Sequence, residues 1–377
     1  RKATHGEGFI RGFFNVIKSA TTGTGAALER LFITGVSPVT MDDVTSGFNI
    51  GTNITNDSWF NDLVGFSENE LREMLEYYKE QGVLQESIDE IVAMMKPNYD
   101  NYCFSEDTLE QCMFNSDMAL YFLKSFVLHH KKPKEIVDPN IRTDFNKLAY
   151  LIKLDHGLGE NFSVIKEIAE QGEIITDIVT HFSALEMTDP SNFKSLLFYF
   201  GLLSIKGVDM VGRPILHVPN LVVREQLFNF LIQGYIKHDI FKIDMNKMSA
   251  LFENMAFRGD WKPLFDFIAN AVREQSRIRE YIEGEAHIKG FLLAYLGMYR
   301  YYQLYPEYEL NKGFADFFFK PSLSVPVLPP FTYLLEVKYA KAGASEKEIR
   351  ALLMRRANSY FVIVKMSWWQ KPRRKVN

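Results

Sequence analysis

Two apolar segments near the end of the chain each carry one acidic residue, and this pattern limits the possible folds more than any other feature. Asp316 interrupts the run FADFFF, and twenty residues later Glu336 interrupts LLEVKY. Both runs are short and rich in aromatic and aliphatic residues, which is typical of strands that are largely buried. A carboxylate in such a strand is unfavourable unless a metal ion or a counter-charge offsets its lost hydration. The two segments therefore predict neighbouring strands whose acids share a partner.

The spacing within the second segment adds a cation to this predicted site. Glu336 and Lys338 are two residues apart, and residues i and i+2 of a strand project from the same face. Hard oxygen ligands with one or two carboxylates suit Mg²⁺, or Mn²⁺, that keeps waters for a phosphate substrate. The alternative is that Glu336 and Lys338 form a surface pair at a strand end, while Asp316 caps a turn.

The elements around these acids have a definite order. We expect a long helix in IREYIEGEAHIKGFLLAYLGMYRYY, two strands on either side of Asn311 to Gly313, and a third strand in FTYLLEVKYAK. A helix in SEKEIRALLMRRA and a strand in FVIVKMSWW follow. Residues 276–377 are therefore predicted to form one domain with the order α, β, β, β, α, β.

The first part of the chain, residues 1–95, mixes helical and irregular stretches. Apolar residues from Phe9 to Ile17 follow a helical stripe, and Leu31 to Ile33 form a short apolar run that predicts a buried strand. Ser67 and Glu70 have the spacing of a capping box for a helix that Gly82 ends. The overall fold class is expected to be α/β and α.

The middle part, residues 96–275, has mainly helical periodicity. One interruption, in SLLFYFGLLSIKGV, RPILHVPN and LVVREQLFNFLIQGYI, has the order helix, strand, turn, strand, helix. This order suits a winged helix, and a helical connector with a β-hairpin is the alternative, because no basic recognition helix is visible. The helical middle is also a candidate surface for a protein partner.

The length and composition of the chain limit the number of domains and the kinds of site and partner to expect. A chain of 377 residues exceeds the usual size of a single core, so several domains are expected. No apolar run approaches the roughly 18 residues that cross a membrane, and Cys103 and Cys112 suggest neither a disulfide framework nor a zinc site. A soluble, cytoplasmic protein is therefore predicted. The net charge of −4 gives no general attraction to nucleic acid, so phosphate binding must arise locally.

Several longer stretches of the sequence also resemble those of a known protein family. These stretches are LERLFITGVSPVTMDDVTSGFNIGTNIT, YDNYCFSEDTLEQCMFNSDMALYFLKSF, EGEAHIKGFLLAYLG, ELNKGFADFFF and YLLEVKYAK. They resemble a largely bacterial family that joins an AAA-ATPase-like domain to a PD-(D/E)XK nuclease domain. The resemblance implies that residues 1–95 are the end of a P-loop ATPase-like α/β domain, and that residues 276–377 are a nuclease domain with nucleic acid, DNA or RNA, as substrate.

The resemblance also assigns roles to individual residues. Asp316, Glu336 and the carbonyl of Val337 would bind Mg²⁺ or Mn²⁺, and Lys338 would orient water and stabilise charge on the phosphate. Glu285 would be the acid on the preceding helix. The remaining candidates are Glu283 as a rival to Glu285, Glu309 on the first strand, and His287, which is more typical of a hydrogen-bonded helix residue.

The chain departs from the family in two ways. The connection from Ser345 to Tyr360 is short and offers no obvious polar residue for the site. No GxxxxGK[ST] loop occurs in the sequence, and such a loop is what holds nucleotide phosphates. The chain starts at Arg1 without methionine, so we expect a fragment that lacks the nucleotide-binding half and does not bind ATP. The predicted function is a metal-dependent nuclease, and the alternative is an inactive nuclease fold that serves as a binding or scaffold protein.

Overall fold

The chain forms two compact units, which we describe one at a time. Unit 1 comprises Arg1–Ile168 and Gly172–Arg224, and unit 2 comprises Ala169–Gln171 and Glu225–Asn377. The computed structural model describes residues 9–21, 25–35, 51–133, 136–138, 160–180, 186, 189–275, 285–310, 313–322, 325, 327–337 and 362–366. The predicted division into three domains at residues 95 and 275 stays a prediction.

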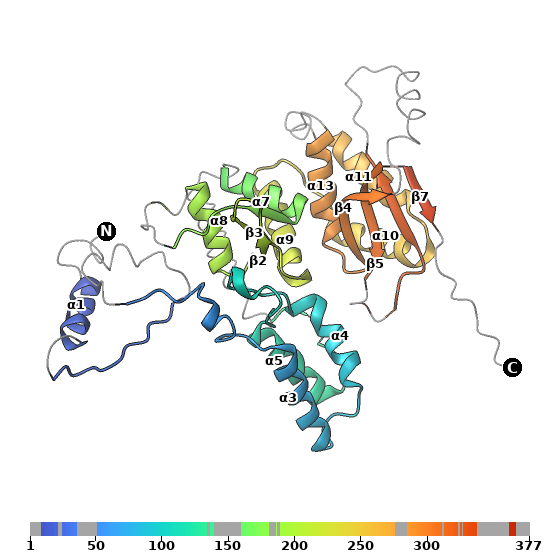
Figure 1. The fold of residues 1–377 in the computed structure, drawn as a ribbon. Coiled ribbons are helices and arrows are strands. Elements are labelled where there is room, and N and C mark those ends of the chain that lie inside the picture. The colour runs from blue at the N-terminus through green and yellow to red at the C-terminus, as the bar shows by residue number, and fades with distance from the viewer. Residues whose placement is uncertain are drawn as a thin grey trace. The chain divides into compact units, whose positions relative to one another are not determined.

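Unit 1 contains helices and one small sheet (Figure 1). Its elements in chain order are α1 (Phe9–Thr21), η2 (Ser58–Phe60), α3 (Glu68–Glu80), α4 (Ile88–Tyr99), η3 (Glu106–Thr108), α5 (Ser116–His129), α7 (Glu160–Gln171), β1 (Glu173–Ile175), α8 (Pro190–Tyr199), β2 (Ser204–Val208) and β3 (Pro214–His217). The end of α7, Ala169–Gln171, belongs to unit 2, and helix α9 (Leu221–Lys237) begins in unit 1 and continues in unit 2.

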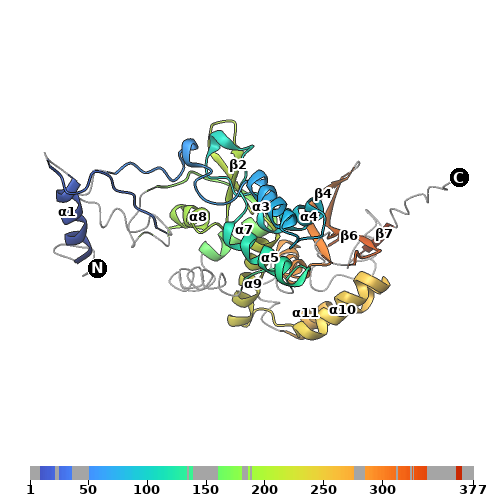
Figure 2. The same ribbon diagram turned by 90° about the horizontal axis from the view of Figure 1, so that it is seen from below.

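Helices α3, α4 and α5 pack together around an apolar core (Figure 2). Leu71 and Leu75 of α3 meet Ile91 of α4 and Phe122 of α5, and all four are fully buried or nearly so. The predicted capping box at the start of α3 is confirmed: the Ser67 side chain accepts from the amide of Glu70, whose carboxylate accepts from the amide of Ser67. These contacts fix where α3 begins and which face it buries.

The sheet of unit 1 has three antiparallel strands in the order β1-β3-β2. The predicted order of helix, strand, turn, strand and helix is confirmed in α8, β2, β3 and α9, while β1 was not predicted. The interpretation as a winged helix stays a prediction. Most of α8 is buried, including Phe193 and the run Ser195 to Phe198, so this helix offers few side chains to a groove of DNA.

The predicted buried strand at Leu31 to Ile33 is wrong. These residues lie in irregular structure, and Leu31, Phe32 and Ile33 are 40%, 64% and 41% exposed. A short apolar run becomes a strand only where a neighbouring strand takes up its hydrogen bonds. Within the described ranges, the isolated bridges and strand pairs involve other residues.

In the residues that the structure describes, unit 2 combines the rest of α9 with three further helices and a second sheet. The elements are α10 (Met245–Arg258), α11 (Lys262–Glu274), α13 (Glu285–Gly297), β4 (Tyr302–Leu310), β5 (Gly313–Pro321), β6 (Thr332–Glu336) and β7 (Val362–Met366). The strands are antiparallel in the order β4-β5-β6-β7. The strands expected on both sides of Asn311 to Gly313, in FTYLLEV and in FVIVKM are thereby confirmed.

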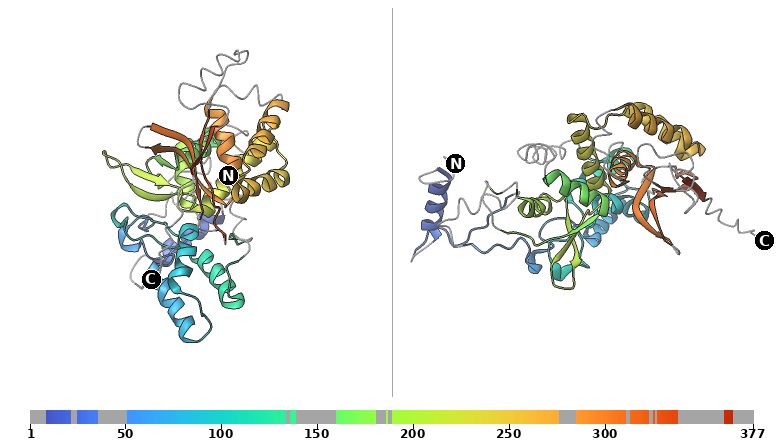
Figure 3. Two further views of the ribbon diagram at one scale, coloured as in Figure 1. Left: turned by 90° about the vertical axis from the view of Figure 1, so that its right-hand side faces the viewer. Right: turned by 90° about the horizontal axis from the view of Figure 1, so that it is seen from above.

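One face of this sheet packs on α10, which lies beside it in Figure 3. Tyr302 of β4 contacts Phe252 of α10, and the buried hydroxyl of Tyr333 on β6 donates to the carbonyl of Met255 at 2.7 Å. Helix α13 is apolar on most sides and packs against Phe228, Tyr235 and Phe241. Aromatic contacts therefore hold the sheet against α10, and they hold α13 against α9 and Phe241. No helix within the described ranges has both the length and the apolar character needed to cross a membrane.

Candidate active site

Strand β5 carries the buried acid. Phe317 and Phe319 alternate along the strand and are fully buried, as expected for residues that share one face of a sheet. Asp316 lies on the other face together with Phe318, and only 6% of Asp316 is exposed. A carboxylate at this depth needs partners for its charge and for its oxygen lone pairs.

The register of β5 and β6 brings the two predicted acids together. Phe317 pairs with Leu335, and Phe318 pairs with Leu334. One further step of the same register places Asp316 directly across from Glu336, the last residue of β6. Residues directly opposite in an antiparallel pair project from the same face with their Cβ atoms about 4.5–5.5 Å apart. The register therefore puts the two acids on the same face of neighbouring strands, and Glu336 is half-buried.

Strand β4 lies on the other side of β5. Pro306 pairs with Phe317 and Tyr308 pairs with Ala315, so position 307, a glutamate, is the one across from Asp316. Glu309, the candidate from sequence, lies two residues further along and pairs with Phe314. Its side chain is exposed.

The partners of Asp316 come from two other segments. Its Oδ1 atom forms an ion pair with the Nζ atom of Lys289 on α13 at 2.5 Å. Its Oδ2 atom accepts a short hydrogen bond from the backbone amide of Val337, immediately after β6. One contact comes from the helix, with a partly buried lysine, and the other is a buried contact from the neighbouring strand.

Helix α13 contributes the cation that sequence reasoning missed. Lys289 is the one charged residue in the stretch Ile288 to Gly297, so it interrupts an apolar helix just as Asp316 interrupts an apolar strand. That parallel was the available signal. Glu285 precedes Lys289 by four residues and shares its helix face, whereas His287 lies about 200° away around the helix. His287 is half-buried.

Several predicted residues lie outside what the structure describes. Lys338 and Glu283 are among them, as is the connection from Ser345 to Tyr360. For Glu285 the backbone is described as helix, and its side chain lies outside the description. The structure therefore brings together Asp316, Glu336 and Val337 of the predicted set.

The donor set fits a hard divalent cation. Asp316 and Glu336 supply carboxylate oxygens from adjacent strands, and Mg²⁺ is typically bound through one or two carboxylates plus water and substrate oxygens. Among the side chains that the structure describes, no group of three or more His, Cys, Asp or Glu residues is arranged to hold a metal ion. The fit therefore rests on the two carboxylates and the burial of one of them.

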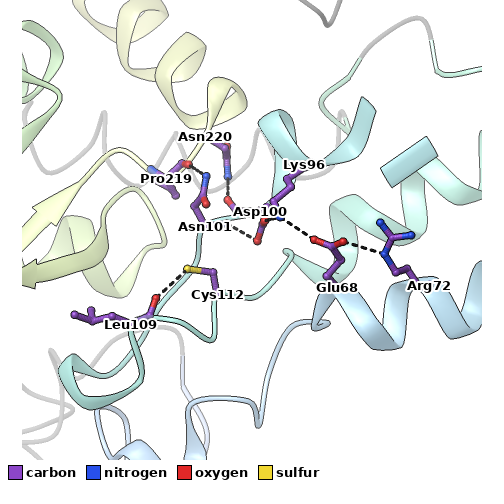
Figure 4. Close-up of polar contacts among 9 residues, drawn as sticks. All are labelled: Glu68, Arg72, Lys96, Asp100, Asn101, Leu109, Cys112, Pro219 and Asn220. Carbon is purple, nitrogen blue, oxygen red and sulfur yellow. Dashed lines mark hydrogen bonds and ion pairs between the residues drawn. The ribbon is translucent and has the colours of Figure 1, made fainter. Parts of the chain in front are cut away.

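Figure 4 shows a second cluster of polar residues, which lies in unit 1 and whose contacts hold segments of that unit together. Lys96 bridges Glu68 at 2.7 Å and Asp100 at 3.8 Å, and the backbone carbonyl of Asp100 accepts from the Asn220 amide. Burial raises the pKa of Asp100, and burial raises the pKa of the Cys112 thiol to about 11. That thiol is protonated at neutral pH and is a poor nucleophile. These contacts join segments of unit 1.

The comparisons with known proteins address the region of the buried acid. Residues 283–360 match the family model described as the PD-(D/E)XK nuclease superfamily. The matched range contains Glu285, Lys289, Asp316, Glu336, Val337 and Lys338. No curated protein and no solved structure matches the chain. The interpretation of residues 1–95 as the end of an ATPase-like domain has no support from these comparisons and stays a prediction.

Proposed function

We propose that unit 2 is a metal-dependent nuclease that hydrolyses phosphodiester bonds of DNA or RNA. The observation that carries the proposal is the placement of Asp316, a buried carboxylate, across from Glu336 on the neighbouring strand. The superfamily match at residues 283–360 supports the same reaction class, because that superfamily consists mainly of nucleases. A fold alone does not specify a substrate, so DNA and RNA are both candidate substrates.

Each residue of the site has a proposed role. Asp316 and Glu336 would hold Mg²⁺ or Mn²⁺, and continuation of the extended backbone through Val337 would present its carbonyl on the side of Asp316, where its amide already points. Such a metal ion lowers the pKa of bound water and stabilises negative charge on a phosphate. Lys338, two residues after Glu336, would orient the water and contact the phosphate.

Glu285 is the better candidate for the acid on the helix. It lies one turn before Lys289, and Lys289 contacts Asp316, so the face of α13 that carries Glu285 is directed towards β5. Helix α13 begins at Glu285, and Glu283 lies outside the described residues. We therefore assign the supporting acidic role to Glu285 rather than to Glu283.

Cleavage assays test the proposal directly. The protein is incubated with Mg²⁺ or Mn²⁺ and with single-stranded DNA, duplex DNA or RNA, alongside Asp316→Ala, Glu336→Ala and Lys338→Ala. We expect cleavage that needs the metal and falls at least about 100-fold in each variant, because second-shell changes alone cost about 10–100-fold at metal sites. Glu173→Ala is the matched control, since it removes a strand carboxylate from the other sheet.

Titration calorimetry separates a nuclease from an inactive nuclease fold. We expect the wild type to bind Mn²⁺ and the double variant Asp316→Ala, Glu336→Ala to lose binding. Nucleic-acid binding without cleavage and without metal binding would replace the proposed function with a scaffold or binding role.

A further inference from the structure

The ion pair between Lys289 and Asp316 occupies the position that a metal ion would need. The Nζ atom of Lys289 lies 2.5 Å from Oδ1 of Asp316, and the two side chains are only 21% and 7% exposed. The other carboxylate oxygen, Oδ2, accepts from the amide of Val337. Both oxygens of Asp316 therefore already have a hydrogen-bond donor, and one of these donors is a full positive charge.

A divalent cation and this ammonium group would repel each other strongly at one carboxylate. Two positive charges a few ångströms apart in a poorly hydrated site are far less screened than in water. The amide of Val337 belongs to the backbone and cannot leave without distorting the end of β6. Lys289 has a flexible four-carbon chain, and its Nζ atom can rotate away while the stem stays against apolar surface. Lys289 is the donor that can yield.

We infer that Lys289 is a built-in counter-ion that holds Asp316 in place without metal and is displaced from Oδ1 when a divalent cation binds. The inference rests on the proposed function, and it concerns how the site is kept assembled. The negative charge of Asp316 is offset at all times, first by the ammonium and then by the metal. Lys289 is a positioning residue, and its exchange with metal lowers the affinity of the site for the ion.

Substitution of Lys289 should therefore strengthen metal binding. Lys289→Met keeps the length of the side chain and removes the charge that the metal displaces, whereas Lys289→Arg keeps the charge. By Mn²⁺ titration calorimetry we expect the Kd of Lys289→Met to fall at least about tenfold, because breaking a buried ion pair leaves an uncompensated carboxylate. The Kd of Lys289→Arg should stay within a few-fold of the wild type. A purely structural lysine would give unchanged or weaker binding in Lys289→Met.

A second measurement uses the unmodified protein and does not depend on the folding of a variant. An amine-acylating reagent is applied with and without Mn²⁺, and labelling of each lysine is read by mass spectrometry. We expect Mn²⁺ to increase labelling of Lys289, because its amine leaves the carboxylate, and to leave Lys206 unchanged. Unchanged or lower labelling of Lys289 in protein that binds Mn²⁺ would overturn the inference.

The outcomes separate this inference from the proposed function. If the wild type binds Mn²⁺ and Lys289→Met does not bind it more tightly, the counter-ion role fails and the metal site stands. If neither protein binds Mn²⁺, both fail. Tighter binding by Lys289→Met, together with loss of binding in Asp316→Ala, supports both.

Discussion

Each of the two antiparallel sheets carries a carboxylate that pairs with a lysine, which comes from the same sheet in unit 1 and from helix α13 in unit 2. In unit 1, Lys206 of β2 pairs with Glu173 of β1, and their side chains are 56% and 43% exposed. In unit 2, Lys289 pairs with Asp316, and the exposed fractions are 21% and 7%. The same kind of ion pair is thus exposed to solvent at one sheet and largely buried at the other.

The difference in burial changes what each pair does. An exposed pair is screened by water and contributes between zero and about 1 kcal/mol, so it can be lost with little consequence. A buried carboxylate has already lost its hydration and depends on its partners. Buried charges with specific partners are common at functional sites, which agrees with the proposed site in the second sheet.

The largest expected effect is the destabilisation that follows removal of the buried cation. In metal-free protein, Lys289→Met should lower the free energy of unfolding of unit 2 by about 3–5 kcal/mol, because Asp316 is left as an unpaired buried charge. Lys206→Met should change the stability of unit 1 by less than about 1 kcal/mol. Hydrogen exchange of amides in β5 and in β2, in increasing urea, measures the two effects separately.

The double variant Lys289→Met, Asp316→Asn is the control for this contrast. With both charges removed, no unpaired charge remains, so stability should recover towards that of the wild type. Equal effects of Lys289→Met and Lys206→Met would remove the distinction between the two sheets.

A smaller effect concerns how each sheet is anchored, and here the two sheets should behave alike. The Tyr333 hydroxyl donates to the carbonyl of Met255, one of the last four carbonyls of α10, which lack partners within the helix. Ser204 of β2 accepts from the amide of Cys103 at 2.8 Å. Tyr333→Phe and Ser204→Ala should each lower the free energy of unfolding by about 1–3 kcal/mol, because each leaves a buried group unpaired.

Urea denaturation of these two variants measures both losses of stability. Similar losses would place the difference between the sheets in the ion pairs alone. A loss in Tyr333→Phe that is much larger than the loss in Ser204→Ala would show that unit 2 depends more on its polar contacts in general.

The smallest expected effect is a pH dependence confined to the first sheet. His217 of β3 lies across from Glu173, and its pKa is lowered by burial and then by Lys206, with Glu173 acting in the opposite direction. A histidine whose folded pKa is lowered stabilises the fold above its unfolded pKa of about 6.5, and this contribution is lost as pH falls through the folded pKa.

Unit 1 should therefore lose stability as pH falls below about 6.5, with a slope of at most about 1.4 kcal/mol per pH unit from this group. His217→Gln should remove that part of the pH dependence, and Lys206→Met should raise the pKa of His217 in an NMR titration. An unchanged pKa in Lys206→Met would contradict the role of the lysine. The second sheet gives no reason to expect the same profile.

Much of the secondary structure could be predicted because its signals are local. The capping box at Ser67 depends on residues three apart, and the strands β4 and β5 follow from a run of aromatic residues broken at Asn311 to Gly313. Strand β1 escaped prediction because it has three residues and is defined by its pairing with β3. Leu31 to Ile33 failed for the converse reason: an apolar run without a described partner strand stayed irregular.

The candidate site also has some features that could be predicted from local sequence and others that could not. The sequence was enough to predict acids in apolar strands and to predict that Glu336 and Lys338 share one strand face, because side-chain alternation is a property of the local backbone. The position of Asp316 across from Glu336 and its ion pair with Lys289 depend on the folded structure. Strand register and the packing of a helix on a sheet arise from contacts between residues distant in sequence, and no local pattern specifies which distant charge will meet a buried one.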